Sequence, residues 1–244
     1  MTIRAVIFDV YGTLLRVGPP PADADERWQN LLRSTFRTGF QAGRLEFSIA
    51  CAQAVAKRHA IARARGIVYP EILWPSVVAE VLPEFSRLKA EAQEEFLFRH
   101  IQTGHTTTLD AGAADVLRFL PTNGCLLGIA SNAQAYSIRE LNEGLAEAGL
   151  EMGLFDPGIC FWSFRHGFSK PDPCVFQILT SRLEALGVPE RATLMVGDHL
   201  DNDIRPARAH GWQTWRITDK AGATGRHEGD WRQLALWLRG AIHQ

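Results

Sequence analysis

Acidic side chains that directly follow apolar segments are the first candidates for chemistry in this 244-residue sequence. Asp9 follows the apolar run at residues 4–8, and Asp198 comes two positions after the apolar run at residues 193–196. An unpaired carboxylate inside a strand is costly to bury, but at the end of a strand it can face a cleft. The alternatives are that Asp9 caps a turn and that residues 198–203 form a solvated acidic turn.

If the two strands are neighbours, Asp9 and Asp198 come close together. Two carboxylates about 4 Å apart repel each other by about 4 kcal/mol at an effective dielectric constant of about 20, and a cation removes that repulsion. Oxygen ligands completed by water favour Mg²⁺ over a softer metal. Gly12 allows the chain to turn sharply after Asp9, and Thr13 adds a hydroxyl there. We therefore expect a Mg²⁺ site at this point.

Two further segments carry polar side chains suited to phosphate chemistry. Lys170 precedes Pro171 and Pro173, which fix the backbone ahead of a helix. Beside a carboxylate nucleophile and a phosphate, its point charge would offset the excess negative charge. Ser131 and Asn132 follow another apolar run, and backbone N–H groups near the next helix start are suited to holding phosphate oxygens. Taken singly, a loop lysine can be solvated and a Ser-Asn pair can simply cap a helix.

The strands and helices that would position these residues alternate along the chain. Buried strands of a parallel sheet are indicated at residues 4–8, 125–130 and 193–196, and weaker strands at 159–162 and 213–217. Helical patterns occur at residues 113–119, 137–150, 173–186, 202–210 and 231–242. This alternation predicts an α/β fold, a Rossmann-like doubly wound parallel sheet covered on both faces. In such folds, sites lie at the carboxyl ends of the strands.

Residues 16–108 have a different pattern, with no convincing strand. One apolar stripe with helical spacing includes Trp28 and Leu32. Further helices are expected at 44–65, 71–82 and 87–103. Because this insertion begins just after the first strand, we expect it to form an α-helical cap domain over the site. Residues 1–15 and 109–244 would then form the core domain.

Taken in order, four segments resemble the motifs of the haloacid dehalogenase-like (HAD) hydrolase superfamily. The segments are Asp9-Val10-Tyr11-Gly12-Thr13-Leu14, Ser131-Asn132, Lys170-Pro171-Asp172-Pro173, and Gly197-Asp198 with Asp203. The resemblance covers residues 3–15 and 109–217, and the insertion resembles the superfamily's helical cap between the first and second motifs. It implies a Rossmann-like core with a hydrolase site.

The resemblance also implies a role for each matching residue. Asp9 would be the nucleophile that forms an aspartyl intermediate, which splits one difficult displacement into two easier ones. Ser131 would hold the transferring group, and Lys170 would balance charge at Asp9. Mg²⁺ would be bound by Asp9, the backbone carbonyl of Tyr11 and Asp198, with Asp203 as a direct or an outer ligand. The substrate would be contacted by Tyr11, Thr13, Ser131 and Asn132.

Tyr11 departs from the pattern of the superfamily's phosphatases. In those enzymes the second residue after the nucleophile is usually another Asp, which protonates the leaving oxygen. A phenol with a pKa of about 10 is a poorer acid–base catalyst near neutral pH. The Asp9-x-Tyr11-Gly12-Thr13 pattern instead resembles the 2-haloacid dehalogenases, whose halide leaves without a proton.

The fourth motif favours a metal-dependent phosphatase over a 2-haloacid dehalogenase. Gly197-Asp198 and Asp203 resemble the metal-binding form, which suits phosphoryl transfer, where charge spreads over the equatorial oxygens. The interpretation is therefore a Mg²⁺-dependent phosphohydrolase that acts on a small phosphorylated metabolite through an aspartyl-phosphate on Asp9. The alternatives are a 2-haloacid dehalogenase-type hydrolase and a weakly active or non-catalytic ligand-binding protein.

Other residues could modify this site. His199 titrates near neutral pH and could supply the missing proton, although a loop histidine can also be merely solvated. Arg27, Arg37 or Arg44 could recognise a substrate anion, and each could equally be a solvated charge on a helix. Trp162 could edge the pocket.

Composition limits the class of partner. Lys and Arg number 26 against 27 Asp and Glu, a formal net charge of −1, whereas a polyanion binder would be strongly basic. The sequence shows no signal region and no apolar run of about 20 residues that could cross a bilayer. The four cysteines form no CxxC pair. We expect a cytoplasmic protein with a small-molecule substrate, no nucleic acid and no membrane contact, and the sequence does not indicate its oligomeric state.

Overall fold

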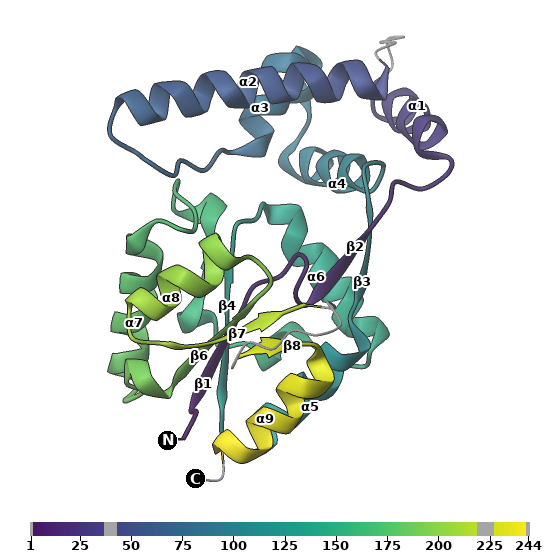
Figure 1. Cartoon of the computed structure of the whole chain (residues 1–244). Coiled ribbons are helices and arrows are strands. Elements are labelled where there is room, and N and C mark those ends of the chain that lie inside the picture. Colours follow the sequence, from purple (N-terminus) through teal and green to yellow (C-terminus); the bar gives the residue numbers. More distant parts are fainter. Residues whose placement is uncertain (1, 37–42, 219–226, 243–244) are drawn as a thin grey trace.

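The computed structural model describes residues 2–36, 43–218 and 227–242. Its main sheet is parallel throughout, in the order β5-β4-β1-β6-β7-β8 (Figure 1). The strands are β1 (Ala5–Phe8), β4 (Leu126–Ser131), β5 (Cys160–Trp162), β6 (Thr193–Gly197), β7 (Gln213–Ile217) and β8 (Glu228–Gly229). The predicted α/β class with a doubly wound parallel sheet is confirmed.

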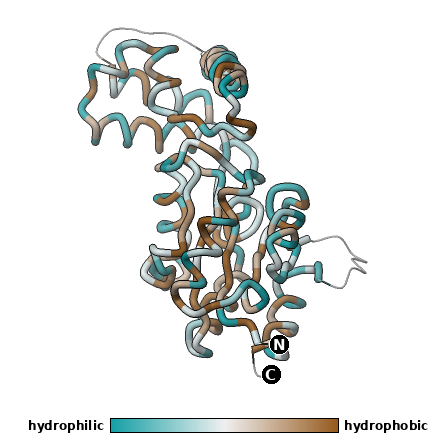
Figure 2. Tube along the Cα trace, turned by 90° about the vertical axis from the view of Figure 1, so that its left-hand side faces the viewer, coloured by the Kyte–Doolittle hydropathy of each residue, from teal (hydrophilic) through white to brown (hydrophobic). Residues whose placement is uncertain are grey.

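Helices cover both faces of this sheet. One face carries α5 (Ala111–Thr122), α6 (Ala135–Glu147) and α9 (Trp231–Ile242), and the other carries α7 (Pro173–Ala185) and α8 (Arg205–Ala209). The alternation of side chains along β1 explains its unbroken apolar sequence. Val6 and Phe8 pack into the first layer, whereas Ala5 and Ile7 pack into the second, so every position of the strand is buried. Figure 2 shows hydrophobic segments gathered along the strands inside the lower body.

The remaining helices form a separate layer above the carboxyl ends of the strands (Figure 1). They are α1 (Ala24–Thr35), α2 (Arg44–Ala64), α3 (Trp74–Val81) and α4 (Ala90–Ile101), with a 3₁₀ turn at Pro83–Arg87. This layer has its own apolar core, in which the rings of Trp28 and Phe47 lie 4.8 Å apart. We propose that it is the cap domain expected at residues 16–108.

The expectation that residues 16–108 contain no strand is wrong. β2 (Leu15–Gly18) and β3 (Thr106–Leu109) form an antiparallel ribbon between the two layers, with Leu15 opposite Leu109 and Gly18 opposite Thr106. Each strand has only four residues, and only β3 alternates regularly between more and less exposed positions. So short a run gives no periodic signal, and only the pairing across about 90 residues of sequence defines it.

Three other boundaries differ from the expected ones. The helix expected at 71–82 begins at Trp74 because the backbone before it bonds to the core instead, with the Glu71 N–H donating to the Gly167 carbonyl. The helix expected at 202–210 is divided into a π-helical turn, Leu200–Ile204, and the short α8. The segment 219–229 is polar and has a loop-like sequence; residues 219–226 lie outside the described part, and Glu228–Gly229 pairs with β7 as β8.

Within the described ranges 2–36, 43–218 and 227–242, no helix is both long and apolar enough to span a membrane.

Candidate active site

Three carboxylates meet at the carboxyl end of the sheet. Asp9 follows β1, Asp198 follows β6, and Asp203 lies in the π-helical turn after it. One oxygen from each of them lies within 4.8 Å of the others. The parallel pairing of β1 with β6 brings them together, since the Asp9 N–H continues the ladder by donating to the Val196 carbonyl at 2.9 Å.

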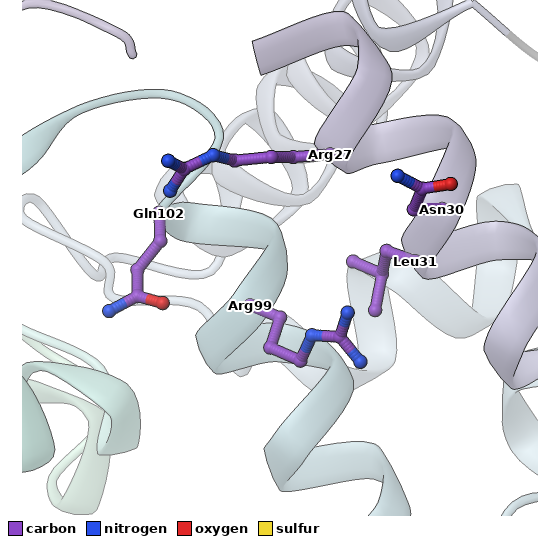
Figure 3. A pocket seen from close by; sticks show the side chains of 5 residues that line it. All are labelled: Arg27, Asn30, Leu31, Arg99 and Gln102. Carbon is purple, nitrogen blue, oxygen red and sulfur yellow. The ribbon is translucent and has the colours of Figure 1, made fainter. Parts of the chain in front are cut away.

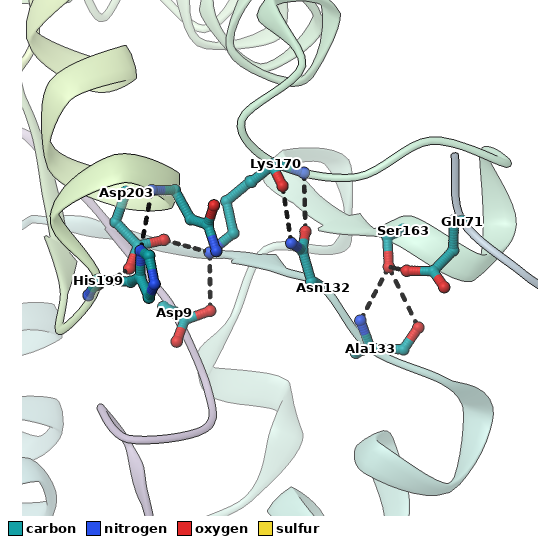
Figure 4. A network of polar contacts seen from close by, with 9 residues as sticks. Asp9, Glu71, Asn132, Ala133, Ser163, Lys170, His199 and Asp203 are labelled. Atoms are coloured by element: carbon teal, nitrogen blue, oxygen red, sulfur yellow. Dashed lines mark hydrogen bonds and ion pairs between the residues drawn. The ribbon is translucent and has the colours of Figure 1, made fainter. Parts of the chain in front are cut away.

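The ammonium of Lys170 lies between two of these carboxylates (Figure 4). Its Nζ donates to Asp9 Oδ1 at 2.7 Å and also to Asp203 Oδ1. The loop that carries Lys170 is fixed by Asn132, whose side chain donates to the Lys170 carbonyl and accepts from the Lys170 N–H, both at 2.8 Å. Residues from the first, second, third and fourth sequence motifs therefore share one hydrogen-bonded cluster.

Burial is the largest single influence on the pKa values of Asp9, Lys170 and Asp198. It raises the pKa of Asp9 to about 6, although the neighbouring Lys170 ammonium acts in the opposite direction. Burial alone would lower the pKa of Lys170, but the carboxylates of Asp203 and Asp9 outweigh it and hold that pKa above its ordinary value. The pKa of Asp198 is raised by burial and by the charge of Asp203. Three carboxylates and one ammonium, when all are charged, leave an excess of two negative charges in a confined space.

Two glycines allow the acidic side chains to approach the backbone. Gly12 has a φ of +77°, and a Cβ built there would lie 2.5 Å from Asp198 Oδ2. A Cβ at Gly197 would lie 2.4 Å from Asp203 Oδ2. The turn after Asp9 and the end of β6 are therefore shaped around the carboxylates, and any side chain at either position would displace them.

Two hydroxyls of the cluster are orphaned. Thr13 Oγ1 and Ser131 Oγ are buried and have no hydrogen-bond partner within the described part of the chain. A buried hydroxyl without a partner is unusual and costs free energy. Thr13 lies in the turn after β1 and Ser131 is the last residue of β4, so both belong to the edge of the sheet that carries Asp9.

Tyr11 does not offer a free hydroxyl. Its Oη lies 2.8 Å from Ser137 Oγ and bonds the buried carboxylate of Glu140, both on α6. The second oxygen of Glu140 lies 3.0 Å from Nε2 of His105, which directly precedes β3. Burial and the adjacent Glu140 carboxylate raise the pKa of Tyr11 well above its ordinary value. Sequence reasoning missed Glu140 and His105, because neither lies in a motif and only the fold brings them to Tyr11.

A cavity of about 310 Å³ lies between the two layers. Its lining residues are Tyr11, Val55, His59, Glu71, Ile72, Trp74, Asn132, Ala133, Gln134, Tyr136 and Ser137. Of the predicted substrate-contacting residues, Tyr11 and Asn132 line this cavity, whereas Thr13 and Ser131 lie buried at the strand ends.

The structure separates the other candidates from the carboxylate cluster. Arg27 lines a different pocket, between α1 and α4 (Figure 3). It pairs with Asp23 at 2.7 Å. Arg44 pairs with Asp25 at 2.7 Å. Arg37 lies outside the described residues.

His199 and Trp162 are also accounted for. The backbone N–H of His199 donates to Asp203 Oδ2 at 3.0 Å, while its ring accepts from the Asn202 N–H at the start of the π-helical turn. Trp162 is the last residue of β5, is buried in the core, and does not line the cavity between the two layers.

Comparison with known proteins defines the family. The model of haloacid dehalogenase-like hydrolases matches residues 3–211, so the chain belongs to the haloacid dehalogenase-like hydrolases. Among curated proteins, none matches the sequence closely enough to count as a relative.

Solved structures share this fold at low sequence identity. A 2-haloacid dehalogenase from Pseudomonas syringae pv. Tomato DC3000 is 21% identical, with 98% of this chain and 99% of that chain covered and a TM-score of 0.62. A putative HAD-hydrolase from Bacillus subtilis bound to magnesium is 20% identical, with 98% and 100% covered and a TM-score of 0.56. A HAD phosphatase from Thermococcus onnurineus is 20% identical, with 98% and 100% covered and a TM-score of 0.53.

Proposed function

We propose that this chain is a Mg²⁺-dependent phosphohydrolase that acts on small phosphate monoesters, with Asp9 as the nucleophile. The observation that carries the proposal is the convergence of Asp9, Asp198 and Asp203 within 4.8 Å beside a single ammonium. A haloacid dehalogenase-type reaction has no use for the excess negative charge that such a cluster holds, whereas a divalent cation would neutralise that charge and so admit an anionic phosphoryl group.

The donor set fits magnesium. Mg²⁺ favours carboxylate and carbonyl oxygens with several waters retained, and an excess of two negative charges matches its charge. Asp9, Asp198 and the backbone carbonyl of Tyr11 would hold it. Asp203 would act from outside, since one of its oxygens is bound to Lys170 and the other to the His199 N–H. When bound, Mg²⁺ supplies Lewis-acid stabilisation of charge on the phosphoryl oxygens.

The protein's own residues account for the displacement. A carboxylate oxygen of Asp9 forms a bond to phosphorus while the bond from phosphorus to the leaving oxygen breaks, and water later cleaves the resulting aspartyl-phosphate. The orphaned hydroxyls of Ser131 and Thr13 would donate to the phosphoryl oxygens. Lys170 keeps its proton, because the carboxylates beside it raise its pKa, and so it orients Asp9 and offsets charge.

The cavity supports a small and uncharged leaving group. Its volume of about 310 Å³ suits a compact metabolite, and none of the described residues that line it is Lys or Arg. The indole of Trp74 and the phenol ring of Tyr136 contribute aromatic surface, and Val55 and Ile72 contribute aliphatic surface. A second phosphate or carboxylate on the leaving group would find neither lysine nor arginine among these lining residues.

One observation favours a second candidate, a 2-haloacid dehalogenase-type reaction. The hydroxyl of Tyr11 is engaged with Ser137 and Glu140, and the raised pKa of Tyr11 makes it a poor proton donor. A halide leaves carbon without a proton, so that chemistry would lose nothing at this step.

Metal-dependent turnover tests the proposal. Acetyl phosphate and p-nitrophenyl phosphate have leaving groups that depart with little help from an acid, and we expect Mg²⁺-dependent hydrolysis of both that EDTA abolishes. Asp9→Asn should remove this turnover, and the matched control Asp201→Asn, an exposed carboxyl paired with Arg205, should keep it. Halide release from 2-halopropionate in EDTA would instead establish the second candidate. Neither reaction, with ligand binding retained, would point to a non-catalytic binding protein.

A further inference from the structure

The connection between α2 and α3 reaches from the cap layer to the core (Figure 1). We call residues 69–74 the latch segment. Its backbone pairs with the core loop ahead of α7, because the Ser169 N–H donates to the Tyr69 carbonyl and the Glu71 N–H donates to the Gly167 carbonyl, both at 3.0 Å. The latch segment therefore joins cap to core at a point separate from the β2–β3 ribbon.

Glu71 makes the side-chain contacts of this junction (Figure 4). Its Oε2 accepts from the buried Ser163 hydroxyl at 2.6 Å, and its Oε1 accepts from Gln134 Nε2 at 3.1 Å. Gln134 also accepts from the Trp74 N–H at 3.1 Å. A carboxylate from the cap thus binds two side chains of the core at once.

The contact between Glu71 and Ser163 fixes the backbone amide of Ala133, which directly follows the second motif. An ionised carboxylate can only accept, so the 2.6 Å contact requires Ser163 to donate its single hydroxyl proton to Glu71, in competition with the Ala133 carbonyl, which lies 3.2 Å from the same hydroxyl. The lone pairs of Ser163 Oγ are then free for the Ala133 N–H, which donates to it at 2.8 Å. Ala133 directly follows Ser131 and Asn132, so Ser163 links Glu71 to the loop that carries these two residues.

The same segment also holds the loop of the third motif. Ser169, which bonds to Tyr69, is adjacent to Lys170, and the backbone of Lys170 is bonded on both sides by Asn132. The latch segment therefore contacts both loops that flank Asp9, although no residue of it belongs to the carboxylate cluster.

We infer that Glu71 is a positioning residue, which seats the cap and, through Ser163 and Gln134, holds the loop carrying Ser131 and Asn132 in its working shape. The effect on catalysis rests on the proposed function, whereas the effect on the loop does not. Glu71 touches none of the reacting groups of the cluster, so its removal should alter the placement of the phosphoryl-holding loop and leave the nucleophile in place.

Hydrogen exchange of the full-length protein tests the loop directly. We expect the amides of residues 131–137 to exchange at least about 10-fold faster in Glu71→Ala, since the opening of one hydrogen-bonded unit lowers local protection. Glu71→Gln retains one acceptor oxygen, so its exchange rates at residues 131–137 should lie between those of the wild type and those of Glu71→Ala. Ser163→Ala should reproduce the faster exchange of the Ala133 amide. The amides of β1 and β6 should be unaffected. Glu91→Ala, at an exposed carboxyl in the first turn of α4, is the matched control and should behave as wild type.

The kinetic arm measures kcat and KM for acetyl phosphate with Mg²⁺. Small displacements in an active site cost up to about 100-fold in rate. We therefore expect kcat to fall at least about 10-fold in Glu71→Ala, while KM changes little. Glu71→Gln should restore part of the lost kcat. Unchanged exchange at 131–137 in Glu71→Ala, or an equal change in Glu91→Ala, would overturn the inference. Wild-type protein that hydrolyses no phosphate ester would refute the proposed function, while the exchange arm would still decide the role of Glu71.

Discussion

Lys170 Nζ and Asp9 Oδ1 lie 2.7 Å apart although 161 residues separate them in the sequence. Both side chains are almost completely buried, and the same ammonium also bonds Asp203. The candidate nucleophile is therefore fixed in direction by a cation that belongs to a different loop, and removal of that cation should affect both the fold and the reaction.

Replacing Lys170 by Met should destabilise the protein by about 3–5 kcal/mol, because it leaves buried carboxylates without their counter-charge. Urea unfolding at neutral pH, followed by circular dichroism, measures the free energy of unfolding. The matched control is Arg205→Met, which removes an exposed ion pair with Asp201 and should cost less than about 1 kcal/mol. Equal losses in the two variants would contradict a structural role for the buried ammonium.

Asp198→Asn should abolish stabilisation by magnesium. If Mg²⁺ binds the wild-type cluster, a free concentration 100 times its Kd raises the free energy of unfolding by about 2.7 kcal/mol. The variant loses one ligand and one negative charge, so its unfolding in urea should be nearly the same with Mg²⁺ and with EDTA. Asp201→Asn serves as control and should respond as the wild type does; a full response in Asp198→Asn would show that the metal binds elsewhere.

Tyr11→Asp should raise turnover of phosphate esters that have poor leaving groups. A carboxyl at this position can protonate the departing oxygen, which contributes roughly 10²-fold or more in such reactions. Alkyl phosphates should gain, whereas p-nitrophenyl phosphate should change little, because its leaving group needs no proton. Tyr11→Asp removes the hydroxyl that bonds the buried Glu140 carboxylate, so Tyr11→Asp combined with Glu140→Gln is the companion variant that removes the buried charge. A fall for both substrate types in both variants would show that Tyr11 has a role of its own.

The cap should lose stability in mild acid through His100. Burial, and secondarily the charge of Arg44, lowers the pKa of His100 from its ordinary 6.5 to about 4. The unfolded chain therefore binds a proton that the folded chain refuses, and stability falls as the pH drops from about 6.5 to 4, by about 3 kcal/mol in all. His100→Gln, which stays neutral, should lack this part of the pH dependence. Urea unfolding at pH 7 and pH 4.5 measures it, and parallel curves for the two proteins would refute it.

Most of the core was predictable because its signals are local. Two unbroken apolar runs, one before Asp9 and one before Gly197, each form a strand. An unbroken apolar sequence indicates burial on both faces of the sheet, which is typical of a parallel sheet. The motif residues then meet because parallel strands place their carboxyl ends at one edge.

The contacts that the sequence does not reveal are those between distant elements. The pairing of Tyr11 with Glu140 joins residues 129 positions apart, and Glu71 reaches Ser163 across 92 positions. Each residue taken alone is an ordinary helix or loop residue, and its role exists only once the layers are packed. The four-residue strands β2 and β3 escaped prediction for the same reason, since each is defined by its partner.

The pairing of Gly18 with Thr106 brings the two ends of the helical insertion next to each other. The insertion leaves and re-enters the core at adjacent backbone positions, so the path of the core is the same with or without it. A two-residue hairpin turn joining β2 directly to β3 would close the ribbon and excise the whole helical layer. A different helical layer joined at this ribbon would lie above the same carboxylate cluster, and it would also have to supply the contacts that the latch segment makes with the core.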